Sequence, residues 1–445
     1  MASRALVAGL FWLVFAAHSL SPIATSSDSR WTVPLTLSLL SQGNTDLDEF
    51  ASDMRAHRYR GIQCVDAGHR VIQPSPETGC PAGGRAYYTY PIGTSVVAAP
   101  VMFAMDACVR VLGPVAIRLA GARLTPAERQ FAGREYSKCY ALVELVLASF
   151  IVALAAVVTF LTVRLFLPAA GAVLLALLFA FATPAYSTAS RALWQHGPNM
   201  LMLATALYLF ARAGSRASLL KWTAVPLVFA YFIRPTSIVF VALTGAFVLV
   251  HHREQFRKWL LLAACTAIPF LAQSVLVFHW PLAPYFVAQH FLDVSPQSLP
   301  HLLAALAGQC ISPSRGLFTF SPFLLFSLAG MYLAFRRGWQ TPLVYYLAAG
   351  VALHWMAISA FADWTGGHSF GPRYFSDIVP ILIFFLVPVF QLPRKPMLLC
   401  GVFLVCVLAS LFIHFRGATA WDVYLWNGDA GGVTPARAWD WRDPQ

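Results

Sequence analysis

The chain of 445 residues is 58% hydrophobic, 14% aromatic and only 11% charged. So few polar side chains cannot cover a water-soluble globule of this size, which excludes an ordinary soluble domain. The net charge of +12 is expected when the basic loops of a membrane protein face the cytoplasm, so it does not by itself indicate nucleic-acid binding. The composition therefore predicts an integral membrane protein.

The first apolar run covers residues 5–25, directly after Arg4. It resembles a signal peptide but is long enough to span a bilayer, and the later apolar runs favour an uncleaved signal anchor over residues 1–26. Residues 27–139 are then predicted to form a large first extracytoplasmic loop. From Ser26 to Cys139 the chain is rich in turn residues and carries twelve Lys or Arg and ten Asp or Glu.

Two apolar pieces of this loop are expected to lie at the membrane interface. Residues 31–40 are predicted to form a short interfacial helix with Trp31 as its anchor. Residues 95–112 carry Asp106 and Arg110, and a further crossing here would place the later basic loops outside. We therefore expect an interfacial or re-entrant helix in this second piece.

Residues 140–415 contain ten more apolar runs, which with the first make about eleven transmembrane helices. The predicted fold is thus an all-α polytopic membrane protein. The ten runs are 140–163, 169–189, 198–211, 222–233, 238–250, 259–278, 317–335, 343–361, 378–390 and 397–415.

The distribution of charge predicts the topology. Twelve basic residues fall on alternate connections, where the only acid is Glu254, and such a bias is typical of cytoplasmic loops. An odd number of spans then places the N-terminus in the cytoplasm and residues 416–445 outside. This polar, Trp-rich tail is expected to cap the outer face.

The cysteines permit a disulfide but give no sign of a metal. Cys64 and Cys80 flank a Pro- and Gly-rich loop predicted to lie outside, where a disulfide is permitted; Cys108, Cys139 and Cys310 are further candidates. No CxxC pair or Cys/His spacing indicates zinc, so we expect neither a metal nor a cofactor.

The densest group of carboxylates is Asp46, Asp48 and Glu49, soon after the first apolar run. These acids are expected in water just outside the membrane. One interpretation is the solvated, acid-rich start of a short helix. The other is a general base held at the membrane surface.

Because positive charge is expected on the cytoplasmic side, basic residues on the outer side must have another role. Four arginines are expected there at the ends of different helices, and each has Pro or Gly within a few residues: Arg191, Arg234, Arg315 and Arg373. Singly, each guanidinium is explained by a lipid phosphate or a local carbonyl. Together they predict a shared anion pocket, because guanidinium groups bind phosphate oxygens in a bidentate fork. His196 and His368 lie beside two of them, as structural hydrogen-bonding groups or as further phosphate ligands.

A tyrosine cluster follows the acidic segment. Tyr87, Tyr88 and Tyr90 precede Pro91 in a tight turn. Aromatic residues are common at membrane interfaces, but these also suit stacking on a sugar ring or hydrogen bonding to phosphate. We assign them, with Arg58, to substrate binding.

Acids and arginines on one face favour glycosyl transfer from a lipid-phosphate donor. The lipid phosphate is a competent leaving group that needs only charge stabilisation. The acceptor hydroxyl needs a carboxylate to take its proton, and attack on the far face of the sugar inverts the anomeric centre.

These residues resemble the GT-C superfamily of polyprenyl-phosphate-sugar-dependent membrane glycosyltransferases, in which a catalytic Asp, often in an Asp-Glu pair, follows the first helix. Asp48-Glu49 matches that pair, which makes Asp48 the expected base, with Asp46 in reserve. The tyrosine turn resembles a segment of protein mannosyltransferases and lipid A aminoarabinose transferases. The aminoarabinose enzymes have a Lys before the Pro, where this chain has Tyr90.

Other segments, such as GGHSFGPRY and WDWRDPQ, look like those of a bacterial branch of this superfamily. The resemblance covers nearly the whole chain. It implies a multi-pass protein of the bacterial inner membrane, a lipid donor that enters between helices, no metal, and a glycan, lipid or protein as acceptor. The alternatives are a lipid or lipid-linked-sugar transporter and a non-catalytic membrane subunit. A transporter would need ionisable residues along the membrane interior, and the spans offer few, chiefly Glu144.

Overall fold

The structure is a computed structural model that describes residues 4–25, 28–287, 298–394, 396–428 and 433–445. It is mostly helical, and five of its described segments are long and apolar enough to cross a membrane. These segments are α4 (Gly93–Ala120), α6 (Tyr140–Val163), α11 (Arg253–Phe278), Arg373–Phe390 and α19 (Met397–Thr419). Their length and composition suit a multi-pass membrane protein, while the expected number of about eleven spans remains a prediction.

Shorter helices complete the bundle. Several match the predicted apolar runs to within a few residues, because their ends coincide with Pro, Gly or charged side chains. The shorter helices, of which the last two lie within the segment Arg373–Phe390, are α1 (Arg4–Ser19), α7 (Ala169–Phe181), α8 (His196–Ala213), α9 (Ala224–Ile233), α10 (Ile238–His251), α12 (Pro284–Val287), α13 (Leu299–Ile311), α14 (Leu317–Phe320), α15 (Leu325–Arg337), α16 (Leu343–Ser359), α17 (Val379–Phe385) and α18 (Val387–Phe390).

Three of the predicted continuous spans are interrupted. The run 169–189 ends as an α-helix at Phe181, and a π-turn covers Ala185–Ala189 after Pro184. The run 317–335 breaks at Ser321-Pro322, and the run 378–390 divides at Leu386 before Pro388. Proline has no N–H to donate and clashes with the preceding turn, so it ends or kinks each helix.

Helix α6 forms the centre of the bundle. It packs against α1, α7 and α8, and small side chains such as Ala148, Ala153 and Ala156 are fully buried along it. Small residues let neighbouring backbones approach closely, which is how helices associate when lipid removes the hydrophobic driving force. By contrast, most side chains of α11 and α19 are not buried.

The first loop folds into a small domain that contains a sheet, which corrects the all-α prediction. Strands β1 (Ile62–Val65), β2 (Val71–Ile72) and β3 (Arg85–Tyr88) form an antiparallel sheet of order β2-β1-β3. Helices α2 (Thr32–Ser41) and α3 (Ala51–Ala56) flank it. Cys64 and Cys80 form a disulfide. Strands this short leave little periodic signal in a polar sequence.

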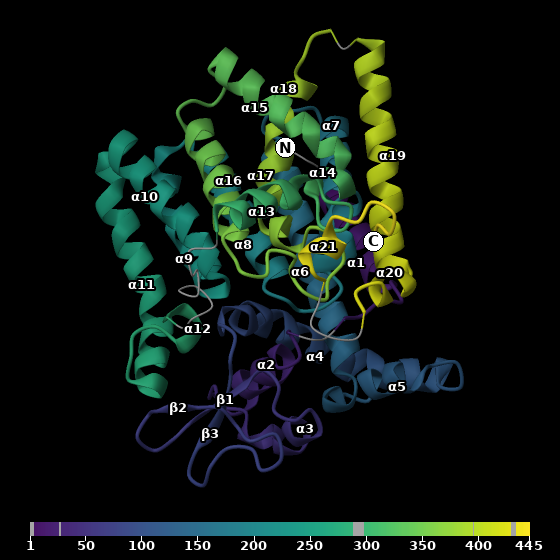
Figure 1. Ribbon diagram of the computed structural model, residues 1–445, viewed down its shortest axis with the longest axis vertical. Coiled ribbons are helices and arrows are strands. Elements are labelled where there is room, and N and C mark those ends of the chain that lie inside the picture. Colours follow the sequence, from purple (N-terminus) through teal and green to yellow (C-terminus); the bar gives the residue numbers. More distant parts are fainter. Residues whose placement is uncertain (1–3, 26–27, 288–297, 395, 429–432) are drawn as a thin grey trace.

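Helix α4 follows this domain and reaches α5 (Pro126–Ala132). In Figure 1 it runs below the bundle, crosswise to α11 and α19. Its length and composition nevertheless suit a span, so the interfacial position expected for residues 95–112 stays a prediction. The chain ends in α20 (Asp422–Leu425) and α21 (Pro435–Ala438).

Candidate active site

A cavity of about 760 Å³ lies where the small domain meets the bundle. Residues far apart in the sequence line it, including Asp28 after α1, Tyr90 after β3, Trp194 before α8 and Arg373 before α17. Its walls combine aromatic rings with charged groups. A cavity of this size and mixed lining suits a small polar ligand or the head of a lipid.

An ion pair crosses this cavity. Arg373 Nη1 lies 3.0 Å from Asp28 Oδ2, and the side chains are 13% and 43% exposed. The Arg373 guanidinium also lies over the rings of Trp194, at 5.0 Å, and Tyr374, at 5.4 Å. The aromatic rings hold the guanidinium in place, while Asp28 keeps access to water.

A second arginine is held by a buried carboxylate. Arg234 Nε lies 2.9 Å from Asp377 Oδ2, and His196 Nδ1 lies 2.9 Å from the other carboxylate oxygen. Asp377 is fully buried, whereas both Arg234 and His196 line the cavity. Asp377 therefore fixes the orientation of two side chains that are available to a ligand.

Two buried hydrogen-bond donors of cavity residues have no partner in the described part of the chain. They are Trp194 Nε1 and Arg373 Nε. Buried donors are almost always paired, because an unpaired one costs about 1–3 kcal/mol.

The segment that carries Asp28 is tied to both the bundle and the small domain. Ser29 donates its hydroxyl to the buried Glu144 of α6, which also accepts the Leu193 N–H at 3.1 Å. Tyr88 donates to the carbonyl oxygen of Asp28. Glu144 thus joins the Asp28 segment to the loop before α8, which explains an acid within an otherwise apolar helix.

A glycine shapes the loop before Arg373. Gly371 has φ +62°, and a Cβ on it would lie 2.6 Å from Phe320. Its carbonyl accepts the Arg373 N–H at 2.9 Å. Only glycine combines this left-handed conformation with such close contact, so it sets the position of Arg373.

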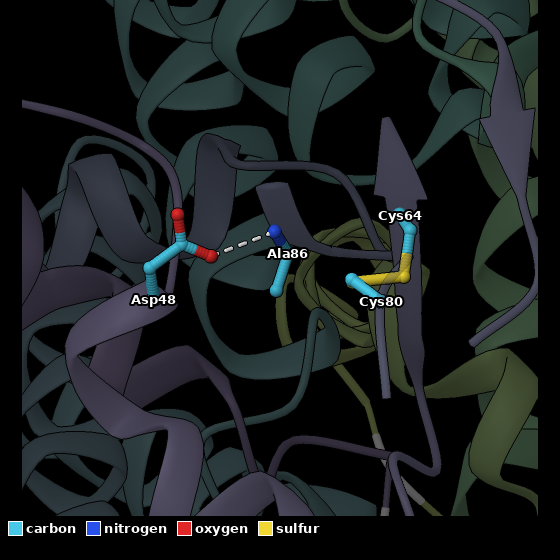
Figure 2. The surroundings of a disulfide bond; sticks show 4 residues. All are labelled: Asp48, Cys64, Cys80 and Ala86. Atoms are coloured by element: carbon cyan, nitrogen blue, oxygen red, sulfur yellow. Dashed lines mark hydrogen bonds between the residues drawn. A yellow bond between two sulfur atoms is a disulfide. The ribbon is translucent and has the colours of Figure 1, made fainter. Parts of the chain in front are cut away.

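The acidic segment Asp46–Glu49 does not reach the cavity. Asp46 pairs with Arg85 at 2.9 Å, Glu49 accepts the Ser38 hydroxyl, and Asp48 Oδ1 accepts the Ala86 N–H at 2.9 Å (Figure 2). Leu47 also donates to Ala86 O, so the segment extends the sheet beside β3. Burial raises the pKa of Asp48, and the bond from Ala86 offsets part of that rise.

Only two of the four predicted arginines line the cavity, Arg234 and Arg373. Arg191 is fully buried and donates to His18 O at 2.8 Å and to Ile23 O at 3.4 Å. Arg191 therefore holds the chain at the end of α1.

Arg315 instead binds the C-terminal tail. It donates to Asn427 Oδ1 at 2.7 Å, to Gly367 O at 3.1 Å and to the Gln445 side chain. Arg315 and His368 are not among the described residues that line the cavity. The predicted anion pocket is thus smaller than the sequence indicated, because Arg191 and Arg315 donate to backbone carbonyls and side chains elsewhere in the chain.

Of the four residues predicted to bind substrate, three line the cavity and one lies outside it. Tyr88, Tyr90 and Arg58 line the cavity. Tyr87 points into a neighbouring apolar niche, where its ring centre lies 5.9 Å from that of Phe278. Burial raises the pKa of both Tyr88 and Tyr90, so these hydroxyls stay protonated.

Sequence reasoning missed Asp28, Trp194 and Asp377. One available signal for Asp28 was its place as the first acid after the first apolar run. Trp194 lies within the WQHGP segment beside His196, while nothing local marks Asp377, whose partners come from other helices.

No family model matches this chain, and no curated protein matches it either.

Proposed function

We propose that this protein is an inverting glycosyltransferase that moves a sugar from a polyprenyl-phosphate donor to a hydroxyl acceptor. The observation that carries the proposal is the Asp28–Arg373 pair in a cavity that Arg234 also lines. Asp28 replaces Asp48 as the general base, since Asp48 is bonded to the sheet. The sequence resemblance to GT-C enzymes supports the same reaction class.

The reaction assigns a separate role to each charged group. The donor phosphate binds Arg373 and Arg234, which releases Asp28 from its ion pair. Asp28 takes the proton of the acceptor hydroxyl as the new bond forms at the anomeric carbon. The bond between that carbon and the phosphate oxygen breaks, and the guanidinium groups stabilise the departing lipid phosphate.

The proposed location follows from the charge distribution. Basic loops on one side imply that the opposite end, with the small domain and the cavity, lies outside the cytoplasm. We propose the bacterial inner membrane, with the N-terminus in the cytoplasm and the C-terminal tail outside. Epitope labelling at both termini in intact cells tests this topology.

Binding of the lipid phosphate is the first test. The protein in phosphatidylcholine nanodiscs is titrated with polyprenyl phosphate, using the fluorescence of its tryptophans. We expect saturable binding that Arg373→Ala weakens at least about tenfold, because a charge-assisted contact is lost. Arg337→Ala, at an exposed arginine in the last turn of α15, is the matched control. No binding, or equal affinity for Arg373→Ala, would contradict the proposal.

Turnover is the second test. A panel of polyprenyl-phosphate sugars with alcohol acceptors is assayed by mass spectrometry for released polyprenyl phosphate and new glycoside. We expect both products with at least one donor, and movement of intact donor across the membrane without either product would favour a transporter.

A further inference from the structure

A second group of arginines lines the same cavity from the small domain. Arg58 and Arg60 lie in the turn between α3 and β1, and both side chains are exposed. They therefore occupy the solvent-facing part of the cavity, whereas Arg234 and Arg373 are largely buried.

The turn is braced in an unusual conformation. Arg58 and Tyr59 have φ values of +51° and +55°, in the left-handed region that non-glycine residues rarely adopt. Tyr59 is buried, and its N–H donates to Met54 O at 2.9 Å. Trp31 Nε1 donates to Arg60 O at 2.7 Å. Such strain persists only where the surroundings impose it, and it is concentrated at ligand-binding sites.

Trp31 also links this turn to the proposed base, because Asp28 lies only three residues earlier in the chain. Tyr88 strengthens the link, since it pairs with Ile62 in the sheet and donates to Asp28 O. The turn and Asp28 are thus fixed relative to one another, as acceptor and base must be.

The two pairs of arginines differ in charge compensation. Asp28 pairs with Arg373 and Asp377 with Arg234. Among the described residues, no carboxylate lies within ion-pair distance of Arg58 or Arg60; Asp363 is the other acid in the cavity lining. Two arginines against the one exposed carboxylate of Asp363 leave the outer part of the cavity with net positive charge, which suits a second anion.

We infer that Arg58 and Arg60 bind the phosphate of the acceptor, a sugar phosphate that is either free or the head of a phosphorylated glycolipid. This inference rests on the proposed function, because it names the acceptor class of the same cavity. The donor phosphate binds the inner arginines, Arg234 and Arg373. The acceptor phosphate binds the outer ones, Arg58 and Arg60, and the hydroxyl of the acceptor sugar is directed towards Asp28.

The test uses the whole protein in phosphatidylcholine nanodiscs. Saturation-transfer NMR measures binding of glucose 1-phosphate and of neutral methyl glucoside. A second arm compares binding of the lipid head group in nanodiscs that contain either phosphatidylinositol 4-phosphate or phosphatidylinositol. Together the two arms distinguish a phosphate carried on the sugar ring of a lipid from the phosphate of a free sugar. We expect the phosphorylated probe to bind more tightly in at least one arm, and Arg58→Ala/Arg60→Ala to weaken that binding at least about tenfold.

Two controls make the result specific. Arg55→Ala/Arg70→Ala removes the same charge from exposed positions of the small domain outside the cavity lining, and it should leave binding unchanged. Arg58→Lys/Arg60→Lys should retain part of the affinity, because it keeps the charge but loses the bidentate fork.

The outcomes separate this inference from the proposed function. If Arg58→Ala/Arg60→Ala weakens the binding of polyprenyl phosphate instead of the binding of the sugar phosphate, these arginines form part of the donor site. The inference then fails while the proposed function stands. Equal binding of neutral and phosphorylated probes also overturns it. If binding of the sugar phosphate depends on Arg58 and Arg60 but polyprenyl phosphate does not bind, the phosphate site stands and the proposed function fails.

Discussion

Two acidic segments lie close together in the sequence but have different surroundings. Asp46, Asp48 and Glu49 are bonded to Arg85, Ala86 and Ser38. Asp28 stands at the cavity, paired with Arg373, and is still 43% exposed. The number of carboxylates in a stretch therefore says little about which one can take up a proton. What matters is whether the carboxylate lines a cavity that an acceptor can enter, as Asp28 does and the other three do not.

The largest effect is expected at Asp28. Asp28→Asn keeps the size of the side chain but removes the proton acceptor, so we expect the turnover number for sugar transfer to fall by a factor of about 10² to 10⁴. Binding of polyprenyl phosphate should be retained, since the amide no longer competes for Arg373. Mass spectrometry of released polyprenyl phosphate measures the first effect, and tryptophan fluorescence measures the second.

Asp48→Asn is the matched control for this comparison. It should leave the turnover number within about twofold, because Asp48 does not line the cavity. Loss of transfer in Asp48→Asn with retention in Asp28→Asn would reverse the roles of the two segments.

The arginines allow a parallel comparison. Arg315→Ala removes a buried guanidinium that bonds Asn427, Gly367 and Gln445. It leaves several acceptors unpaired, so we expect about 3 kcal/mol less stability. Arg416→Ala, at an exposed ion pair with Asp422, should cost less than about 1 kcal/mol. Thermal unfolding in detergent measures both variants, and equal midpoints would show that the Arg315 network does not anchor the tail.

The disulfide should stabilise the small domain. Cys64 and Cys80 enclose a loop with a sequence separation of 16, and closing such a loop contributes about 3 kcal/mol in the chain-entropy account. Cys64→Ser/Cys80→Ser should therefore speed hydrogen exchange in β1 and β3, without a comparable change in α6. Cys108→Ser, at an exposed free cysteine, is the control. Unchanged exchange in the strands would contradict a structural role.

The smallest effect is expected in the pH dependence of Asp48. Because burial raises its pKa in the folded state, ionisation costs the folded state stability as the pH rises above the pKa of the unfolded chain. Asp48→Asn should remove this loss and shift stability at neutral pH by no more than about 0.5 kcal/mol, because the side chain is only partly desolvated and still reaches water. A variant whose stability falls more steeply than that of the wild type with rising pH would show that the sign is wrong.

Sequence patterns accounted for much of the bundle. Long apolar runs favour helices in a membrane, because a helix satisfies every backbone group within the segment itself. This reasoning placed α6, α8, α10, α16 and α19 to within a few residues. It missed the sheet, whose strands are too short to show a period, and the breaks at Pro184, Pro322 and Pro388, since hydropathy alone does not weigh a missing N–H.

The sequence by itself determined that apolar helices dominate this protein and that arginines and aromatic residues gather at their ends. Only the tertiary structure decided which of these groups meet. Arg191 and Arg315 donate to carbonyls and side chains of distant segments, while Arg234 and Arg373 face a cavity with Asp28. Spacing along the chain cannot show this, because a hydrogen-bond partner hundreds of residues away decides whether a charged group is available to a ligand.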